Sequence, residues 1–292
     1  MLKIIKALYL FLNAIIIIAL LLIHFILKDS SFKKSLLFYS FPLPVIILIL
    51  LGLTVFLSRK FRRYNLVIAG VLLIVWFGRS FKINIPEDVK ETDIEVVFWN
   101  ASHDRGFQES FTENGSIPDV LVLTEIGKND VKELQLKYPN YHFHISEEGL
   151  GVFSKTFLSI EWEKSSKFNT TVLKFETNGI NFYAIDGQAS LDVPRSWGFK
   201  FINELIIKEK QNSILLGDFN IPLESTLLKT IKVNFNNAFV EKGNGFRETW
   251  FWNIPLLSLD HIWVSKDLEI LKAEKIGTFK SDHAMLKTYV RK

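Results

Sequence analysis

Three long apolar runs open the chain, and shorter segments of alternating apolar and polar residues follow them. The runs cover Ala7–Leu27, Leu36–Leu57 and Leu66–Gly78. At about 1.5 Å per residue, the first two can cross a hydrocarbon layer of about 30 Å as helices. The third is shorter and needs its flanking aromatic residues to do so. We predict about three transmembrane helices within residues 1–81. A hairpin with a peripheral third segment is the alternative, and a cleavable signal peptide is a weaker alternative for the first run.

Basic residues set the predicted orientation of these spans. The segment SRKFRRYN, between the second and third runs, holds the densest positive cluster: Arg59, Lys60, Arg62 and Arg63. Positive loops stay in the cytoplasm, so we predict that this loop and the N-terminus are cytoplasmic. We therefore predict an integral protein of the cell (inner) membrane. With three spans, its residues 92–292 lie in the periplasm or outside the cell. If the third run does not cross, this orientation reverses.

Residues 82–93 contain Pro86 and alternating charges, and predict a linker. Residues 94–292 form the next domain. Its predicted strands are Glu95–Asn100, Asp119–Glu125, Tyr141–Ser146, Gly151–Ser154, Thr171–Glu176, Ile180–Ile185, Ser213–Phe219, Asp260–Ser265 and Met285–Val290. Helices are predicted from an Asn129 N-cap to Tyr138 and over Arg195–Lys210. Asn178-Gly179 predicts a tight hairpin. Many strands with few helices favour two packed sheets with helices on their outer faces.

Composition separates the two halves of the chain. Hydrophobic residues make up 48% of the 292 positions, and the mean hydropathy is +0.19. Residues 1–91 carry a net charge of +8, whereas residues 92–292 carry −4. The acidic balance disfavours a processive nuclease, because nucleic-acid binding relies on Lys and Arg. The chain has no cysteine, which excludes disulfides, cysteine-ligated metals and thiol nucleophiles.

Polar residues gather where the predicted strands of residues 94–292 begin or end. They are Asn100, Glu125, Asp218, Asn220, Asp260, His261, Asp282 and His283. Each alone is typical of a turn cap or a surface position. Together they are the set that a metal-assisted hydrolase needs, because phosphoester cleavage requires charge neutralisation and an activated water. Their oxygen ligands favour Mg²⁺ or Mn²⁺ over zinc.

The ordered motifs WN, LTE, GDFN, LDHIWVS and SDH resemble those of the endonuclease/exonuclease/phosphatase family. The resemblance covers about residues 94–291. It implies an α/β (α+β) four-layer sandwich of two mixed sheets flanked by helices, here behind a transmembrane region. It also implies a magnesium-dependent phosphoester hydrolase. By position, Glu125 resembles the principal metal ligand, Asp282 the second metal-side carboxylate and Asn100 the first active-site residue.

The same resemblance implies roles for four further residues. Asp218 would align or activate the attacking water, and Asn220 would contact the phosphate. Asp260 would orient His283, which would hydrogen-bond the scissile phosphate. His261 is expected to support its loop. His103, His142 and His144 match no motif and are interpreted as structural.

One position departs from the family pattern. Asp186 stands where many members have a histidine that donates to the phosphate. An ionised aspartate only accepts hydrogen bonds and repels an anion unless it is metal-bound or protonated. Weakened catalysis, a displaced donor such as Arg195, or an altered metal arrangement would each follow from this change.

The substrate stays open among nucleotides, lipid head groups and nucleic acid. The membrane bilayer is an expected partner, and no obligate protein partner is expected. A non-catalytic module that binds a phosphorylated ligand or a partner is the alternative function, and a purely structural membrane protein is a weaker one. The aromatic segment Thr249–Pro255 predicts either a loop that faces membrane or substrate, or a core strand and turn.

Overall fold

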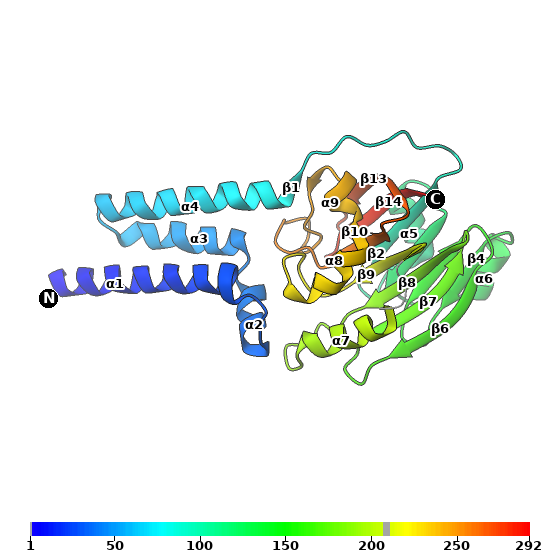
Figure 1. The fold of residues 1–292 in the computed structure, drawn as a ribbon, viewed down its shortest axis with the longest axis horizontal. Coiled ribbons are helices and arrows are strands. Elements are labelled where there is room, and N and C mark those ends of the chain that lie inside the picture. The colour runs from blue at the N-terminus through cyan, green and yellow to red at the C-terminus, as the bar shows by residue number, and fades with distance from the viewer. Residues whose placement is uncertain (1, 207–210) are drawn as a thin grey trace. The chain divides into compact units, whose positions relative to one another are not determined.

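A computed structural model describes residues 2–206 and 211–292 of the chain (Figure 1). The chain divides into two compact units, Met1–Phe81 and Lys82–Lys292. Unit 1 is helical. It contains α1 (Leu2–Leu21), the π-helical segment η1 (Leu22–Leu27), α2 (Phe32–Ser40), α3 (Leu43–Leu53), the 3-10 turn η2 (Thr54–Phe56) and α4 (Arg59–Ser80). Among the described residues, Lys3–Leu27 and Arg59–Ser80 are each long and apolar enough to cross a membrane.

The second apolar run is a bent pair of helices. Phe32–Ser40 and Leu43–Phe56 meet at an angle of 67°, as in a broken span or a re-entrant loop. Pro42 is the N-cap of α3, and it lacks the N–H that would continue α2. Proline also disfavours a helical conformation in the preceding residue, and Phe41 is accordingly non-helical. By length and composition, the described part of unit 1 therefore offers two spans, or three if the bent pair counts as one.

The predicted basic loop before the third run was wrong. Arg59, Lys60, Arg62 and Arg63 form the first turns of α4, which is 22 residues long. Arginine and lysine are good helix formers, so a charged segment need not end a helix. Ser58 is the extended N-cap, and the Arg62 side chain donates to the backbone oxygens of the preceding η2 segment. The third run is consequently longer than its apolar stretch alone indicates.

Unit 2 contains two six-stranded mixed sheets. The first has the order β13-β14-β2-β3-β5-β4 and the second the order β10-β12-β9-β8-β7-β6. The first consists of β2 (Ile94–Asn100), β3 (Val120–Thr124), β4 (His142–Ile145), β5 (Gly151–Ser154), β13 (Glu269–Ile276) and β14 (Met285–Arg291). The second consists of β6 (Ser159–Ser165), β7 (Thr171–Thr177), β8 (Ile180–Asp186), β9 (Ser213–Asp218), β10 (Phe235–Asn237) and β12 (Asp260–Ser265). Two-residue strands lie at β1 (Phe81–Lys82) and β11 (Gly245–Phe246).

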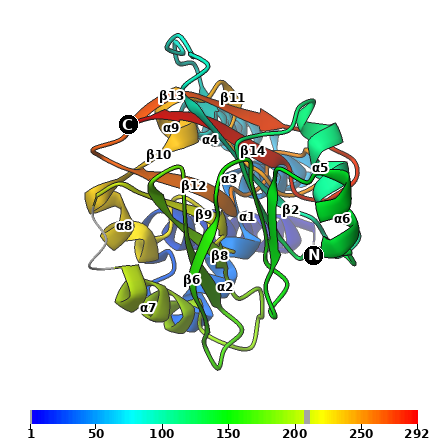
Figure 2. The same cartoon turned by 90° about the vertical axis from the view of Figure 1, so that its right-hand side faces the viewer.

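Helices cover the outer faces of this sandwich. They are α5 (Phe107–Asn114), α6 (Val131–Lys137), α7 (Arg195–Ile206), η3 (Thr226–Leu228) and α8 (Lys229–Asn234). The short helix α9 (Ala238–Lys242) instead contacts strands of both sheets, and its Phe239 is part of the core between them. Figure 2 shows α5 and α6 on one side of the sheets and α7 and α8 on the other. The facing sheets bury a continuous apolar core, in which the rings of Phe175 and Phe182 stack at 5.0 Å. The predicted sandwich of two packed mixed sheets flanked by helices is confirmed.

Two parallel strand pairs determine where the polar strand ends meet. β2 pairs in parallel with β3, and β8 pairs in parallel with β9. Parallel neighbours need a crossover, and α5 and α7 lie in these two connections. The carboxyl ends of each pair therefore lie at one edge. β12 and β14 run antiparallel to β9 and β2, so that their first residues lie at that edge as well.

Most predicted elements match within a residue or two, and the misses have local causes. Asn178 and Gly179 have φ values of 52° and 61° and form the predicted hairpin turn. The N-cap of α6 is Asp130, whose carboxylate accepts two backbone N–H groups, whereas Asn129 donates to the Gly127 carbonyl. Edge strands β6 and β13 escaped prediction because their exposed polar residues weaken the apolar alternation. The predicted positions 207–210 of the second helix lie outside the described residues.

Gly217 allows β9 to pack against β8, and its replacement should be costly. An added Cβ would lie within 1.9 Å of the Ile185 carbonyl oxygen, at a φ of +154°. At Gly245, which has φ +93°, an added Cβ meets nothing within 4 Å. Both alanine variants incur backbone strain of about 1–3 kcal/mol. We expect Gly217→Ala to unfold at least about 5 °C below Gly245→Ala in thermal denaturation of the full chain in detergent. Equal melting temperatures would contradict this packing.

Candidate active site

The site residues of unit 2 come together at one edge of the sandwich. Asn100 ends β2, and Glu125 follows β3. In the second sheet Asp218 ends β9 and lies opposite Asp260, the first residue of β12. His283 precedes β14, which pairs with β2. Residues from five strands thus converge because the parallel crossovers and their antiparallel neighbours place these strand ends together.

Asn100 connects the two sheets. Its side-chain amide donates to Glu125 Oε1 at 3.1 Å and to Asp218 Oδ2 at 3.0 Å. Its side-chain oxygen Oδ1 accepts the backbone N–H of Ser102. Asn100 and Asp218 are almost fully buried. A neutral amide between two carboxylates relieves part of their repulsion while keeping both oriented toward the same point.

Asp218, Asp260 and His283 form a buried cluster that could hold a metal ion. One ligand atom from each lies within 4.8 Å of the others. His283 Nδ1 and Asp260 Oδ2 are 2.8 Å apart, and His283 Nε2 lies 3.9 Å from Asp218 Oδ2. Within the described structure, the buried Asp260 Oδ1 has no hydrogen-bond partner. This free acceptor and the oxygen-rich donor set fit a bound cation.

The surroundings of this cluster raise the pKa values of both Asp218 and His283. Burial, and then the charge of Asp260, raise the pKa of Asp218 to about 7. Burial alone would lower the pKa of His283, but Asp260, Asp218 and Asp282 outweigh it and raise this pKa to about 10. His283 is therefore a cation at neutral pH in the absence of metal. It partly neutralises the carboxylates that surround it.

Asp282 is held by residues that the sequence analysis did not single out. Its Oδ1 accepts from Ser102 Oγ at 3.0 Å, and its Oδ2 accepts from Trp250 Nε1 at 2.9 Å. Ser281 Oγ donates to the Asn100 carbonyl and accepts the His283 backbone N–H. Ser281 stands inside the SDH motif and Trp250 inside the aromatic segment. The sequence therefore drew attention to the segments that contain Ser281 and Trp250, whereas no motif pointed to Ser102.

Glu125 has a second partner that sequence reasoning missed. His103 Nε2 lies 3.2 Å from Glu125 Oε2, and the His103 side chain is 79% exposed. The backbone N–H of His103 also donates to the Glu125 carbonyl at 2.7 Å. His103, which matches no motif and was interpreted as structural, thus lies in contact with a candidate site residue. His103 follows β2 and Glu125 follows β3, and each has a positive φ, which no motif indicates.

Asn220 and Arg195 border the same site. The backbone N–H of Asn220 donates to Asp218 Oδ1 at 2.8 Å, and its side-chain amide donates to the Gly187 carbonyl at 2.8 Å. Arg195 Nη1 donates to the Asn220 carbonyl. These bonds join the loop after β8 to the loop after β9. They place a guanidinium next to the residue expected to contact phosphate.

Asp186 is half-buried at the end of β8, beside Asp218 in the parallel register. Burial raises its pKa to about 8, and the charges of Asp218, Glu125 and Glu148 act in the same direction. At neutral pH without metal, Asp186 is mostly protonated. A protonated carboxyl can donate one hydrogen bond, which an ionised one cannot.

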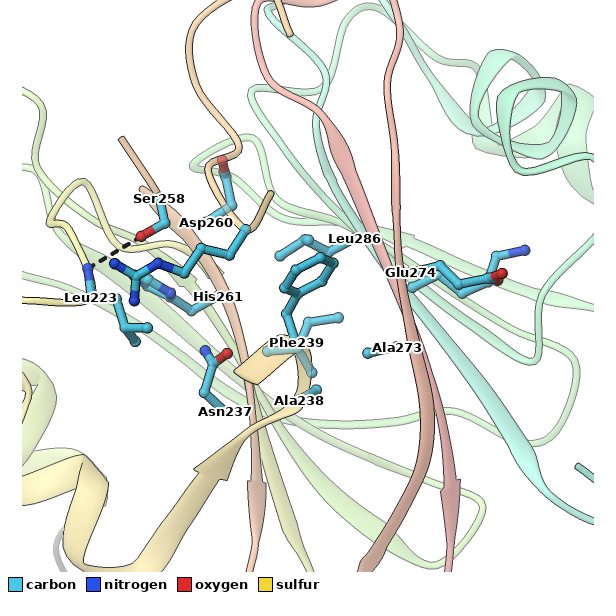
Figure 3. A pocket seen from close by; sticks show the side chains of 13 residues that line it. Leu223, Asn237, Ala238, Phe239, Ser258, Asp260, His261, Ala273, Glu274 and Leu286 are labelled. Atoms are coloured by element: carbon cyan, nitrogen blue, oxygen red, sulfur yellow. Dashed lines mark hydrogen bonds between the residues drawn. The ribbon is translucent and has the colours of Figure 1, made fainter. Parts of the chain in front are cut away.

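His261 lies behind the site. Its Nε2 is 3.0 Å from the Ile221 carbonyl oxygen, and burial lowers its pKa to about 4, so that it is neutral. It lines, with Asp260, Leu223 and Ser258, a small pocket (Figure 3). The space is about 10 Å³, which is enough for one water molecule at most. This pocket is therefore too small to hold a phosphoester substrate.

Comparison with known proteins agrees with this geometry. The model of the Endonuclease/Exonuclease/phosphatase family matches residues 97–283, more than half of the chain. No curated protein matches. Similar solved structures include a humanised D. rerio TDP2, with 14% identity and a TM-score of 0.51 over 69% of this chain and 100% of that chain. The human nocturnin catalytic domain with bound sulfate has 18% identity and a TM-score of 0.51, over 70% and 95%.

A mannosyl-6-phosphatase from Bacteroides thetaiotaomicron is similar to the same extent. It has 14% identity and a TM-score of 0.51, over 68% of this chain and 100% of that chain. At these identities the structural likenesses show the shared fold, and the family model supplies the assignment. The chain belongs to the Endonuclease/Exonuclease/phosphatase family.

Proposed function

We propose that this protein is a membrane-anchored, divalent-metal-dependent phosphoester hydrolase with unit 2 outside the cytoplasm. Members of its family are hydrolases that act on phosphoester bonds. The observation that carries the proposal is the buried Asp218–His283–Asp260 cluster, connected through Asn100 to Glu125 at an open edge. This arrangement combines a base, an oriented imidazole and candidate metal carboxylates within one small region.

A divalent cation would resolve the electrostatics of the site. Asp218, Asp260, Glu125 and Asp186 lie close together, and their mutual repulsion contributes to the raised pKa values. An anionic phosphate would be repelled by these carboxylates. Glu125 and Asp282 are the residues that we propose as ligands, and hard oxygen donors favour Mg²⁺ or Mn²⁺. When bound, the ion supplies charge neutralisation and activation of water.

The remaining residues have complementary proposed roles. Asp218 takes a proton from the attacking water or aligns it. Asp260 holds Nδ1 of His283, so that the Nε2 proton faces the site and can hydrogen-bond the phosphate. Asn100 and Asn220 position the phosphate from both sheets. Asp186, when protonated, and Arg195 provide the donors that the absent histidine would otherwise supply.

The net charge of unit 2 helps to narrow the class of phosphoester that it would cleave. A TDP2 of this fold has been solved with a single-stranded DNA product, and another neighbour is a sugar phosphatase. The net charge of −4 over residues 92–292 disfavours nucleic acid. Nucleotides and lipid head groups remain compatible with the site. Asp186 favours the alternative function, a non-catalytic module that binds a phosphorylated ligand through the same metal.

The first prediction concerns turnover. The full chain in detergent should hydrolyse a nitrophenyl phosphodiester or monoester with Mg²⁺ or Mn²⁺ and stop in EDTA. Asp218→Ala and His283→Ala should each lower kcat about 100-fold or more, because each removes a proton-transfer or phosphate-contacting group. His142→Ala, on edge strand β4, is the matched control and should stay within about twofold. Turnover that survives EDTA would contradict the metal role, and metal-dependent ligand binding without turnover would support the alternative.

The second prediction concerns Asp186 and pH. Folding raises its pKa from 3.8 to about 8, so its stabilising contribution is fully present below 3.8 and is lost as the pH rises through about 8. In EDTA, Asp186→Asn should therefore gain melting temperature over the parent between pH 5 and 8, reaching about 5 °C, and then level off. The exposed Asp192→Asn is the control. Parallel pH profiles for Asp186→Asn and the parent would disprove the shift.

The third prediction concerns topology. Because the chain has no cysteine, single cysteines report on position without background. The test uses cells in which any outer membrane has been permeabilised while the membrane that anchors the chain is intact. In these cells a membrane-impermeant maleimide should label Val233→Cys, on α8 of unit 2. Ser58→Cys, beside the basic start of α4, should be labelled only after the membrane is disrupted. The reverse pattern would place unit 2 in the cytoplasm, and with a cytoplasmic N-terminus it would mean an even number of crossings.

A further inference from the structure

Exposed apolar side chains project from two loops beside the candidate active site. Phe251, Trp252 and Ile254 lie in the loop before β12 and are 36%, 42% and 53% exposed. Phe279, in the loop between β13 and β14, is 81% exposed. We call these four residues the apolar knob. Clustered exposed aromatic and aliphatic residues indicate an interaction surface, whereas isolated ones do not.

The two loops of the apolar knob are fastened to each other. The Asn253 side-chain amide donates to the Thr278 carbonyl at 3.0 Å. Phe251 and Ile254 exchange backbone hydrogen bonds of 3.2 and 2.9 Å, which close a tight turn. The knob is consequently one structured projection formed by two segments that are distant in sequence.

The apolar knob is also bonded to Asp282. The backbone N–H of Trp252 donates to the Asp282 carbonyl at 2.9 Å, and the Trp250 indole donates to the Asp282 carboxylate. The rings of Trp250 and Phe251 lie 4.9 Å apart. A surface that contacts the knob would therefore lie within a few side chains of a proposed metal ligand.

The chain enters unit 2 beside Asn244, a short stretch of sequence before the apolar knob. Asn84 donates its backbone N–H to Asn244 Oδ1 at 2.8 Å and its amide to the Gly243 carbonyl at 2.7 Å. Asn244 returns a bond to the Asn84 carbonyl at 2.9 Å. Only six residues lie between Asn244 and Phe251, so these two residues are at most about 25 Å apart.

The tether from the last candidate span to this fastening point is short. Four residues lead from Ser80, the end of that span, to Asn84, so the connection reaches at most about 14 Å. Further on, Lys242 pairs with Glu87 at 2.6 Å and Arg291 with Asp93 at 2.8 Å, so the predicted linker is bonded along its length. The tether therefore limits the distance between the end of that candidate span and the start of unit 2.

We propose that the apolar knob inserts into the lipid surface of the membrane that anchors the chain, and that the substrate is therefore a phosphoester of a lipid head group. The assignment of a lipid substrate rests on the proposed function, whereas the membrane contact of the apolar knob does not. Tryptophan and phenylalanine are suited to the membrane interface. The acidic balance of residues 92–292 argues against the competing occupant, a nucleic-acid base stacked on Trp252.

The first test measures depth in the bilayer. Trp252→Cys and Phe279→Cys, each labelled with a polarity-sensitive fluorophore, are reconstituted as full chains into phosphatidylcholine–phosphatidylglycerol vesicles. Nitroxide on the lipid acyl chains should quench both labels at least twofold more than a label at Leu136→Cys, an exposed apolar position on α6. Soluble iodide should show the opposite order. Equal iodide quenching at all three positions would overturn the insertion, whether or not the protein hydrolyses anything.

The second test concerns the substrate. The triple variant Phe251→Ser, Ile254→Ser, Phe279→Ser should lower the rate on a vesicle phospholipid, relative to the rate on a soluble nitrophenyl phosphodiester, at least tenfold. A variant with Leu136→Ser and Val233→Ser should leave that ratio within twofold. An equal fall on both substrates would assign the knob to direct substrate binding and overturn the lipid proposal. Absence of turnover on any phosphoester would refute the proposed function, while the quenching result would still decide the membrane contact.

Discussion

Unit 2 depends on the burial of several carboxylates at one edge of its sandwich. Asp218 and Asp260 face each other across neighbouring strands, and Glu125 reaches the same region from the other sheet. Such a cluster is costly, because burial and mutual repulsion both disfavour ionisation. The Asn100 amide, the His283 imidazolium and protonation of Asp186 reduce that cost in the absence of a cation. The buried, mutually repelling carboxylates would favour binding of a divalent ion and then of a phosphate.

The fold produces this convergence through its connections. Two parallel pairs, β2–β3 and β8–β9, each require a helical crossover, and the crossovers leave the carboxyl ends of the strands uncovered. Gly217 then permits the close approach of β8 and β9 that puts Asp186 next to Asp218. Hydrogen bonds through Ser281 and Trp250 bring the loop of Asp282 onto the same edge. Stability is given up at the strand ends and recovered in the apolar core between the sheets.

Unit 1 buries two neutral amides that pair with each other, in contrast to the carboxylate cluster of unit 2. Asn13 and Asn65 exchange side-chain hydrogen bonds between α1 and α4, and both are buried. A buried pair of this kind restrains how far the two apolar helices can slide along each other. The bend at Pro42 makes the number of crossings depend on whether α2 and α3 act as one span. With the N-terminus on a given side of a membrane, that number would decide on which side unit 2 lies.

The candidate membrane spans, the two-sheet class of unit 2 and the ordered motifs from Asn100 to His283 could all be predicted from the amino-acid sequence. These properties depend on apolar periodicity and on short motifs, which are local. The sequence did not reveal that Arg59 begins a helix, that Asp130 caps α6, or that edge strands β6 and β13 exist, because charged residues there override a weak apolar signal. Only the tertiary structure decided that His103 contacts Glu125, that Ser102 and Trp250 hold Asp282, and that Asn84 is fastened near the aromatic loop. These contacts join residues from separate turns or across the whole length of unit 2, and they exist because chain packing, rather than any local pattern, brings their backbones together.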